Sequence, residues 1–287
     1  MKTFGKRIAL VCALAFTTFS FAQDALVLKT EKVAGSVYML SGVGAFTGGN
    51  IGLSIGDDGV AMIDNGIAGL LETLKTEIAK TTDKPIDYLI NTHAHGDHTG
   101  NNVDFGSNGS RIISHRNLRR SLVNKNIADD GLPILTFSDQ MTIHLNGDSA
   151  KIIHFANAHT DGDGVVHFEK ANVIHTGDIM FNGVFPFIDS GNGGSAQGMI
   201  AALKAIGAMA NDNTKIIPGH GPLASKADVL NNAAMIEDGL QIISKMVADG
   251  KSDEEIKAAS PLAAYEDFNW GFISTEKMID QLIKAAR

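Results

Sequence analysis

Three histidines and one aspartate lie within six residues of this chain, directly after the apolar run 86–90. The segment reads Asn91-Thr92-His93-Ala94-His95-Gly96-Asp97-His98. Crowded polar side chains compete for space and for hydrogen bonds, so a dry protein core has little use for them. Imidazole nitrogen and carboxylate oxygen, in contrast, are ligands that zinc prefers. The cluster therefore indicates a metal site rather than a polar loop with chance histidines.

The spacing within the cluster predicts two directions of ligation. His93 and His95 are two residues apart, so both can point the same way from extended chain. Asp97 and His98 are adjacent, so their side chains diverge and can serve a second metal.

Three more candidate ligands each follow a short apolar strand elsewhere in the chain. His159 follows the predicted strand 151–155, Asp178 follows the strand 173–175, and His220 follows the strand 215–217. Each has a glycine nearby, and glycine lets the backbone approach a metal closely. The remaining histidines are expected to lie on sheet surfaces or to hydrogen-bond the ligands; they are His115, His144, His154, His167 and His175.

Hydrophobic patterns predict two halves that each contain strands and end with helices. The first half is expected to hold strands at 33–40, 50–55, 60–63, 86–90 and 111–114, with helices at 68–80 and 117–125. The second half is expected to hold strands at 141–145, 151–155, 165–168, 173–175 and 215–217, with a helix at 195–209. Such an arrangement predicts an α/β sandwich of two sheets with helices outside.

From about residue 225 the pattern becomes helical to the end of the chain. We therefore expect a catalytic domain at 23–224 and a helical extension at 225–287 packed on it. Four aromatic residues of this extension are expected to pack it against the body, with a substrate wall as the alternative; they are Tyr265, Phe268, Trp270 and Phe272.

Residues 1–22 have the pattern of a secretory signal peptide, with a basic start, an apolar run at 8–19 and small residues before Gln23. The apolar run is too short to span a bilayer, which needs about 20 residues. The only cysteine, Cys12, lies in this segment, so the mature chain would have no thiolate to offer as a ligand or nucleophile. We expect a bacterial periplasmic or secreted protein with no membrane attachment after cleavage.

Composition and net charge limit the classes of molecule that this chain is expected to bind. The chain has 287 residues, of which 44% are hydrophobic and 20% are charged, as in an ordinary globular protein. Its formal net charge of −8 argues against a nucleic-acid partner, because binding to phosphates needs clustered Lys and Arg. A small-molecule substrate is expected, and the oligomeric state stays open.

The motif His93-Ala94-His95-Gly96-Asp97-His98, followed by His159, Asp178 and His220, resembles the full motif set of the metallo-β-lactamase superfamily. The resemblance implies an αββα sandwich with two Zn²⁺ ions at one edge of the sheets. It implies that His93, His95 and His159 hold the first ion, that Asp97, His98 and His220 hold the second, and that Asp178 bridges them.

The ligand set also separates this chain from some branches of that family. In one large group of true β-lactamases a cysteine takes the place of Asp178 and no histidine matches His98; another group lacks the bridging aspartate. The complete set is similar to glyoxalase II, to lactonases and to secreted hydrolases associated with sulfur-oxidation or quinoprotein gene clusters. A di-iron branch usually has glutamate in place of the second histidine, so His95 argues against it.

These features predict a zinc-dependent hydrolase in which a metal-bridging hydroxide attacks a carbonyl group. Two cations lower the pKa of water to about 7 and stabilise the oxyanion that forms. Asp97 is expected to orient the hydroxide. Candidate substrates are lactams, including β-lactams, lactones, esters and thioesters. The alternatives are an iron-containing oxidoreductase and a non-catalytic protein that binds metal or ligand.

Four residues of the segment 181–195 are candidates for substrate binding, namely Asn182, Gly193, Gly194 and Ser195. The last three open the helix 195–209, and amides at a helix N-terminus can hold a carboxylate. The alternative is a loop that ends in a helix cap. The loops 42–50 and 181–195 are expected to set specificity.

Overall fold

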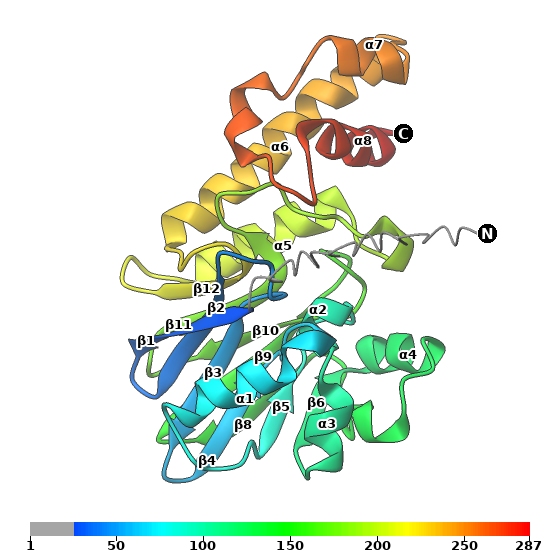
Figure 1. The fold of residues 1–287 in the computed structure, drawn as a ribbon. Coiled ribbons are helices and arrows are strands. Elements are labelled where there is room, and N and C mark those ends of the chain that lie inside the picture. The colour runs from blue at the N-terminus through cyan, green and yellow to red at the C-terminus, as the bar shows by residue number, and fades with distance from the viewer. Residues whose placement is uncertain (1–25) are drawn as a thin grey trace, which may run out of the picture.

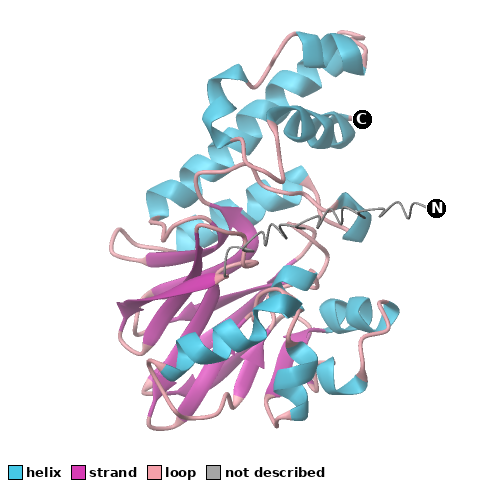
Figure 2. Ribbon diagram, viewed as in Figure 1, coloured by secondary structure: helices cyan, strands magenta, loops and turns pink. Residues whose placement is uncertain are grey.

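The computed structural model describes residues 26–287 and has two β-sheets stacked between layers of helices (Figures 1 and 2). This is the αββα arrangement of the α/β class that the sequence predicts. The expected signal peptide at 1–22 lies outside the described residues. Within 26–287, no helix combines the length and the apolar character needed to cross a bilayer.

The first sheet has seven strands in sequence order. They are β1 (Val27–Ala34), β2 (Val37–Val43), β3 (Ile51–Gly56), β4 (Gly59–Ile63), β5 (Tyr88–Ile90), β6 (Arg111–His115) and β7 (Leu135–Phe137). β1 to β4 pair antiparallel through hairpins, whereas β4 to β7 run parallel. The carboxyl ends of β4, β5 and β6 therefore meet at one edge of the sandwich, which is where ligands collect in parallel sheets.

The second sheet has five strands in the order β12-β11-β10-β9-β8. Their bounds are β8 (Gln140–Leu145), β9 (Asp148–Phe155), β10 (Asp163–Phe168), β11 (Val173–Phe181) and β12 (Lys215–His220). Only β11 and β12 pair in parallel. Their carboxyl ends reach the same edge of the sandwich as the end of β4. Asn50 precedes β3, whose first residues pair with the last residues of β4, and its side chain donates to the carbonyl of Pro218 in β12 at 2.9 Å.

Helices cover both outer faces (Figure 1). On the side of the first sheet lie α1 (Leu71–Ala79), α2 (Gly96–Thr99), α3 (Asn102–Ser107) and α4 (Arg116–Asn124). On the side of the second sheet lie α5 (Ala196–Met209), α6 (Lys226–Ala248), α7 (Asp253–Ala258) and α8 (Thr275–Ala286). The short turns are η1 (Ala68–Leu70), η2 (Asp129–Gly131), η3 (Ser190–Asn192) and η4 (Ala263–Phe268).

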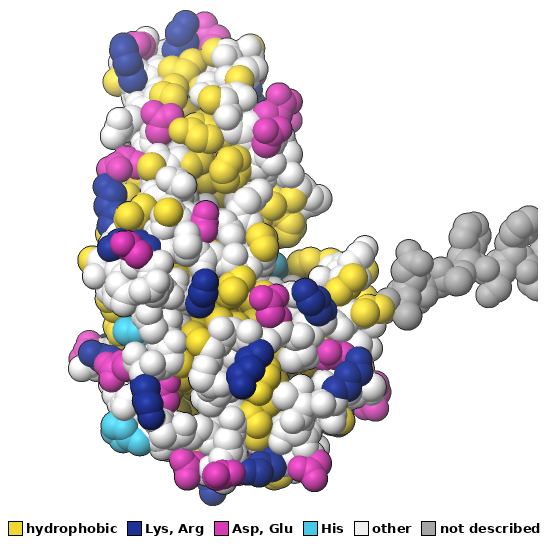
Figure 3. All heavy atoms as spheres, turned by 90° about the vertical axis from the view of Figure 1, so that its left-hand side faces the viewer, with side chains coloured by type: hydrophobic (Ala, Val, Ile, Leu, Met, Phe, Trp, Pro, Cys, Tyr) yellow, Lys and Arg dark blue, Asp and Glu magenta, His cyan; other side chains and the backbone are white. Residues whose placement is uncertain are grey.

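The buried core has three main layers, of which the one between the first sheet and its helices includes Leu53 of β3 and Leu74 of α1. The layer between the sheets includes Ile90 from the first sheet and Val166 from the second. The layer between the second sheet and the helices includes Ile174 of β11, Leu203 of α5 and Leu282 of α8. This last layer includes residues on both sides of the expected boundary between 23–224 and 225–287. The C-terminal helices therefore share a core with the second sheet. On the face shown in Figure 3, basic and acidic side chains are interspersed over the lower part of the molecule.

The sequence pattern did not predict β1 or β7, and the expected strand 33–40 is interrupted by the turn between β1 and β2. Several strands are longer than predicted, and two of these extensions affect the site. β11 was expected to end at His175 but continues to Phe181, so Asp178 lies within the strand rather than after it. β12 was expected to stop at Pro218 but continues to His220. β12 is an edge strand, and the missing N–H of a proline costs no ladder hydrogen bond when it faces away from the sheet.

His115 and His154 stack across the gap between the two sheets. Their ring centroids are 3.6 Å apart and their planes differ by 7°. A nitrogen of His115 bonds the carbonyl of Ser138 at 2.9 Å, and a nitrogen of His154 bonds the carbonyl of Asp163 at 2.9 Å. The pair therefore links β6 of one sheet to β9 of the other.

Acidification should weaken this link. Burial, together with the neighbouring His154, lowers the pKa of His115 to about 4, whereas an unfolded histidine has a pKa of 6.5. Its contribution to stability is therefore complete above pH 6.5 and is lost as the pH falls towards 4. Urea unfolding measures how much the free energy of unfolding falls between about pH 7 and about pH 5. This decrease should be larger in the wild type than in His115→Gln by about 1–2 kcal/mol. His144→Gln, on an exposed position of β8, is the control, and equal pH dependence in all three proteins would contradict the prediction.

Candidate metal centre

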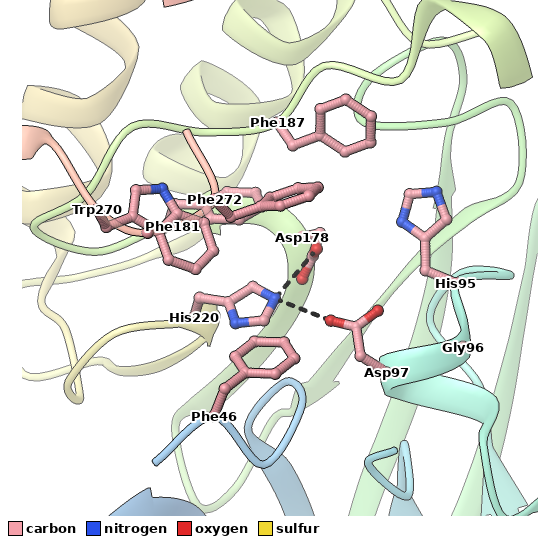
Figure 4. Close-up of a pocket in the computed structure, with 11 residues that line it drawn as sticks. Phe46, His95, Gly96, Asp97, Asp178, Phe181, Phe187, His220, Trp270 and Phe272 are labelled. Carbon is pink, nitrogen blue, oxygen red and sulfur yellow. Dashed lines mark ion pairs between the residues drawn. The ribbon is translucent and has the colours of Figure 1, made fainter. Parts of the chain in front are cut away.

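All seven predicted ligands come together at the carboxyl edge of the two sheets. The loop after β5 and the start of α2 carry four of them, and the turn after β9 carries His159. Asp178 lies within the second half of β11, and His220 is the last residue of β12. The seven form two groups, His93 with His95, His159 and Asp178, and Asp97 with His98 and His220. Figure 4 shows four of them around one cavity.

The first group has the spacing of a four-coordinate site. His95 Nδ1 lies 3.1 Å from His93 Nε2 and 3.0 Å from His159 Nε2. Asp178 Oδ2 lies 3.7 Å from each of those two Nε2 atoms. Ligand atoms about 2.0–2.1 Å from a tetrahedral zinc ion are about 3.3–3.4 Å from one another. The group therefore matches a zinc site in both donor type and spacing.

The second group shares Asp178 with the first. Asp97 Oδ2 lies 3.5 Å from His98 Nε2 and 3.4 Å from His220 Nε2. Asp178 places Oδ2 3.4 Å from His220 Nε2 and Oδ1 3.1 Å from His98 Nε2. One carboxylate thus faces both groups, as a bridging ligand must.

Two atoms of the cluster lack a protein partner. His98 Nε2 and Asp178 Oδ1 are buried and neither makes a hydrogen bond; although they are 3.1 Å apart, they are not aligned for one. Buried polar atoms are rarely left in this state without a further ligand. The residues present therefore fit a pair of divalent cations.

Further polar groups hold the ligands in place. Asp64 Oδ2 bonds His98 Nδ1 at 2.7 Å, and the same carboxylate accepts hydrogen bonds from Thr92. Asp189 Oδ2 bonds His95 Nε2 at 2.8 Å, and the carbonyl of Phe187 bonds His159 Nδ1 at 2.7 Å. Such partners fix the ring orientation of histidine ligands.

Asp64 and Asp189, which contact two of the candidate ligands, were not among the site residues expected from the sequence. Asp64 directly follows β4, just as the histidine cluster follows β5, so its position carried a usable signal. Asp64 is buried in a left-handed conformation, with φ of 59°. Asp189 lies in an irregular loop 94 residues from the histidine that it contacts, and no local pattern marks it.

Charges within the cluster control protonation. Burial alone would raise the pKa of Asp178, but His98, His220 and His93 hold that pKa well below its ordinary range. Burial would lower the pKa of His220, yet Asp178 and Asp97 raise it to about 9. Asp178 therefore stays ionised and requires positive charge beside it, either from protons or from cations.

Gly219 allows the backbone of β12 to pass directly against Asp178, because a Cβ atom there would overlap Asp178 Oδ1. Gly219→Ala should displace the carboxylate, lower the bound metal below the wild-type ratio and destabilise the fold by about 1–3 kcal/mol. Metal analysis and urea unfolding measure these two effects. Gly69→Ala is the matched control, since nothing lies within 4 Å of a Cβ at Gly69. Full metal content in Gly219→Ala would show that the close approach is not needed.

The four candidates for substrate binding do not line the cavity beside the cluster. The amide of Gly194 donates to Asp189, and the amide of Ser195 donates to Asn157 and Ala158. Ser195 Oγ accepts from Gly198 as the N-cap of α5, so the helix-cap alternative describes this segment. Two further candidates are engaged elsewhere, since the Gly193 carbonyl accepts from Asn157 and the Asn182 side chain donates to Pro222. Gly194 and Ser195 therefore have no free amide for a substrate carboxylate.

The cavity has a volume of about 620 Å³ and is walled mainly by aromatic rings. Besides His95, Gly96, Asp97, Asp178 and His220, its lining comprises Phe46, Phe181, Phe187, Trp270, Gly271 and Phe272. The sequence favoured a packing role for the tail aromatics, and Tyr265 and Phe268 do pack against each other and the body. Trp270 also packs against the core, as expected, and in addition Trp270 and Phe272 form part of the cavity wall.

A family model described as the metallo-beta-lactamase superfamily matches residues 44–220, a range that contains all seven predicted ligands. The chain belongs to this superfamily. Solved structures of the superfamily share its fold. A metallo-beta-lactamase from Pontibacter korlensis matches 74% of this chain and 99% of its own, with a TM-score of 0.65 and 15% identity. The DIM-1 metallo-beta-lactamase matches 74% of this chain and 99% of its own, with a TM-score of 0.63 and 16% identity.

A curated protein matches a smaller part of the chain. The alpha subunit of 2,4-dinitroanisole O-demethylase from Nocardioides sp. (strain JS1661) is 28% identical over 102 residues. The match spans 35% of this chain and 31% of that protein, so about a third of either sequence is compared.

Proposed function

We propose that this superfamily member is an exported, dinuclear zinc hydrolase that cleaves a carbonyl compound such as a lactone, ester, thioester or lactam. The observation that carries the proposal is the sharing of Asp178 between two groups of three further ligands beside one cavity. Two cations held in this way would polarise a carbonyl and lower the pKa of water to about 7.

The residues of the chain have separate tasks in this proposal. His93, His95 and His159 hold one position, and His98 and His220 hold the other. Oδ2 of Asp97 faces His220, whereas its second carboxylate oxygen points away from that ring (Figure 4). That second oxygen is placed to orient the attacking water and to accept its proton.

The rings around His220 cover its imidazole, which is buried. Phe181 and Phe46 stack on the two sides of the imidazole, with centroids 5.2 Å and 5.9 Å from it. Excluding water strengthens the electrostatic interactions at the reacting group.

The test combines metal analysis with a substrate panel of neutral and charged lactones, thioesters, esters and a chromogenic β-lactam. We expect two zinc ions per chain and hydrolysis of at least one class. A fully loaded protein that is inert towards every class would reject the hydrolase. Bound iron with an optical band would favour the oxidoreductase alternative. Export is tested by the N-terminus of the protein recovered from the periplasm, which should be Gln23.

Cleavage of an aryl ether is the second candidate, because the cavity is aromatic and the curated relative is named a 2,4-dinitroanisole O-demethylase. Water would attack the ring carbon that bears oxygen, and the products would be the phenol and methanol, so no oxidant is required. Release of 2,4-dinitrophenol from 2,4-dinitroanisole, followed by its yellow colour, distinguishes this reaction from carbonyl hydrolysis.

A further inference from the structure

The cavity beside the metal centre has two chemically different sides (Figure 4). His95, Asp97 and Asp178 lie on one side. The other side is aromatic and consists of Phe46, Phe181, Trp270 and Phe272 around His220, while Phe187 stacks on His95 with a centroid distance of 5.8 Å. None of the described residues that line the cavity is Lys or Arg. The aromatic side therefore offers no cationic partner to a charged substrate group.

Two of these rings come from the C-terminal extension, in the segment between η4 and α8. Trp270 lies 5.5 Å from His220 and 6.1 Å from Phe181, measured between ring centroids. Its Nε1 donates to the carbonyl of Phe185 at 2.9 Å, so the N–H of the indole is already used. Trp270 therefore presents an apolar surface close to the reacting position.

Phe272 stands at the edge of this aromatic side. Its ring centroid lies 5.4 Å from Phe187 and 5.8 Å from Trp270, within the 4.5–7 Å range typical of aromatic pairs. The residue is nevertheless 50% exposed. The part of the ring that no protein group covers is available to an apolar ligand.

The basic residue Lys277 contacts Phe272 at the edge of this wall. Its ammonium lies 5.5 Å from the Phe272 centroid and donates to the Phe272 carbonyl at 2.7 Å. This contact holds Lys277 outside the lining of the cavity. An anionic substrate would need Lys277 to leave this contact and pair with its charge, whereas a neutral substrate would not.

We propose that Trp270 and Phe272 select uncharged substrates that carry an aromatic ring or a similarly bulky apolar group beside the reacting carbonyl. This inference rests on the proposed hydrolase and names its substrate class. The volume of about 620 Å³ falls in the range of small-molecule sites and accommodates a bicyclic compound. The tail thus acts as the specificity-determining part of the site.

The first test compares lactone hydrolysis by the zinc-loaded wild type and by Phe272→Ala. The substrates are dihydrocoumarin, which is aromatic and neutral, γ-butyrolactone, which is small, and its carboxyl-bearing derivative, which is anionic. Phe272→Ala should raise KM for dihydrocoumarin about tenfold, which corresponds to one lost aromatic contact, and should leave γ-butyrolactone within about twofold. Phe272→Leu should recover part of the loss. Tyr265→Ala, an aromatic deletion in the same extension but outside the cavity, should change neither substrate.

The second test measures binding without hydrolysis. Trp270 is the only tryptophan in the chain, so intrinsic fluorescence reports on this wall. Benzamide should cause a saturable change in emission in the wild type and a weaker one in Phe272→Ala. Acetamide has the same amide but no ring, and it should cause no change.

Three results would overturn the inference: an unchanged KM ratio in Phe272→Ala, no fluorescence response to benzamide, or a preference for the anionic lactone that Lys277→Gln abolishes. If no lactone is hydrolysed but benzamide binds as expected, the proposed hydrolysis fails while the selective pocket is supported. The two failures are therefore distinguishable.

Discussion

Asp178→Asn is expected to lower hydrolysis by at least about 10³-fold and to reduce bound metal from two ions per chain to one or none. Asp178 faces both ligand groups, with one oxygen 3.1 Å from His98 and the other 3.4 Å from His220. Asparagine keeps the shape but removes the negative charge, and it replaces one acceptor oxygen with an N–H donor. An N–H group in place of Oδ2 would face the Nε2 atoms of His93, His159 and His220, and one in place of Oδ1 would face that of His98.

Metal analysis and steady-state kinetics on the zinc-supplemented variant measure this prediction. Asp161→Asn is the matched control, since Asp161 is a carboxylate beside the site that pairs with Arg120 at the surface. The control should keep two metals and wild-type rates. Should Asp178→Asn retain both metals and full activity, Asp178 would not be the bridging ligand.

The ligand cluster was predictable from sequence because its signal is local. His93, His95, Asp97 and His98 follow one strand, and the other ligands lie near strand ends with glycine nearby. Parallel strands bring their carboxyl ends to one edge of a sheet, which accounts for Asp178 and His220, whereas the stacking of the two sheets brings the β5 cluster and His159 to them. β11 and β12 end a few residues later than expected, but they still end at the same edge of the sandwich.

The cavity wall was predictable only in part, since Phe46, Phe181 and Phe187 come from the segments 42–50 and 181–195 that were expected to set specificity. Phe272 and Trp270 follow the histidine cluster by more than 170 residues and lie in an irregular segment whose path depends on how α6 and α8 pack. The glycine-rich stretch at 191–195 attracted attention through its composition, yet its amides satisfy the fold itself. Local composition therefore identified the candidate metal ligands, whereas tertiary packing brings Trp270 and Phe272 into the lining of the cavity.

Removal of metal with a chelator is expected to abolish hydrolysis and to lower Tm by roughly 10 °C or more. A site filled at about 1,000 times its Kd contributes about 4 kcal/mol, and each kcal/mol shifts Tm by about 2–4 °C in a chain of this size. Added zinc should restore both activity and Tm. A chelated protein that keeps its Tm and its activity would show that the cluster holds no functional cation.

The loss of Tm on chelation should be larger at about pH 9 than at about pH 6.5, because without metal the site depends on protons. The pKa of His220 is raised to about 9 by Asp178 and Asp97, against 6.5 for an ordinary histidine. Its ion pairs therefore stabilise the metal-free protein fully below pH 6.5 and fade as the pH rises through about 9. The zinc-bound protein has no such dependence, since the cations supply the charge that the protons supplied. Thermal unfolding with and without chelator at both pH values measures the difference, and a gap that narrows at high pH would mean that protons and metal do not compete for the same histidines.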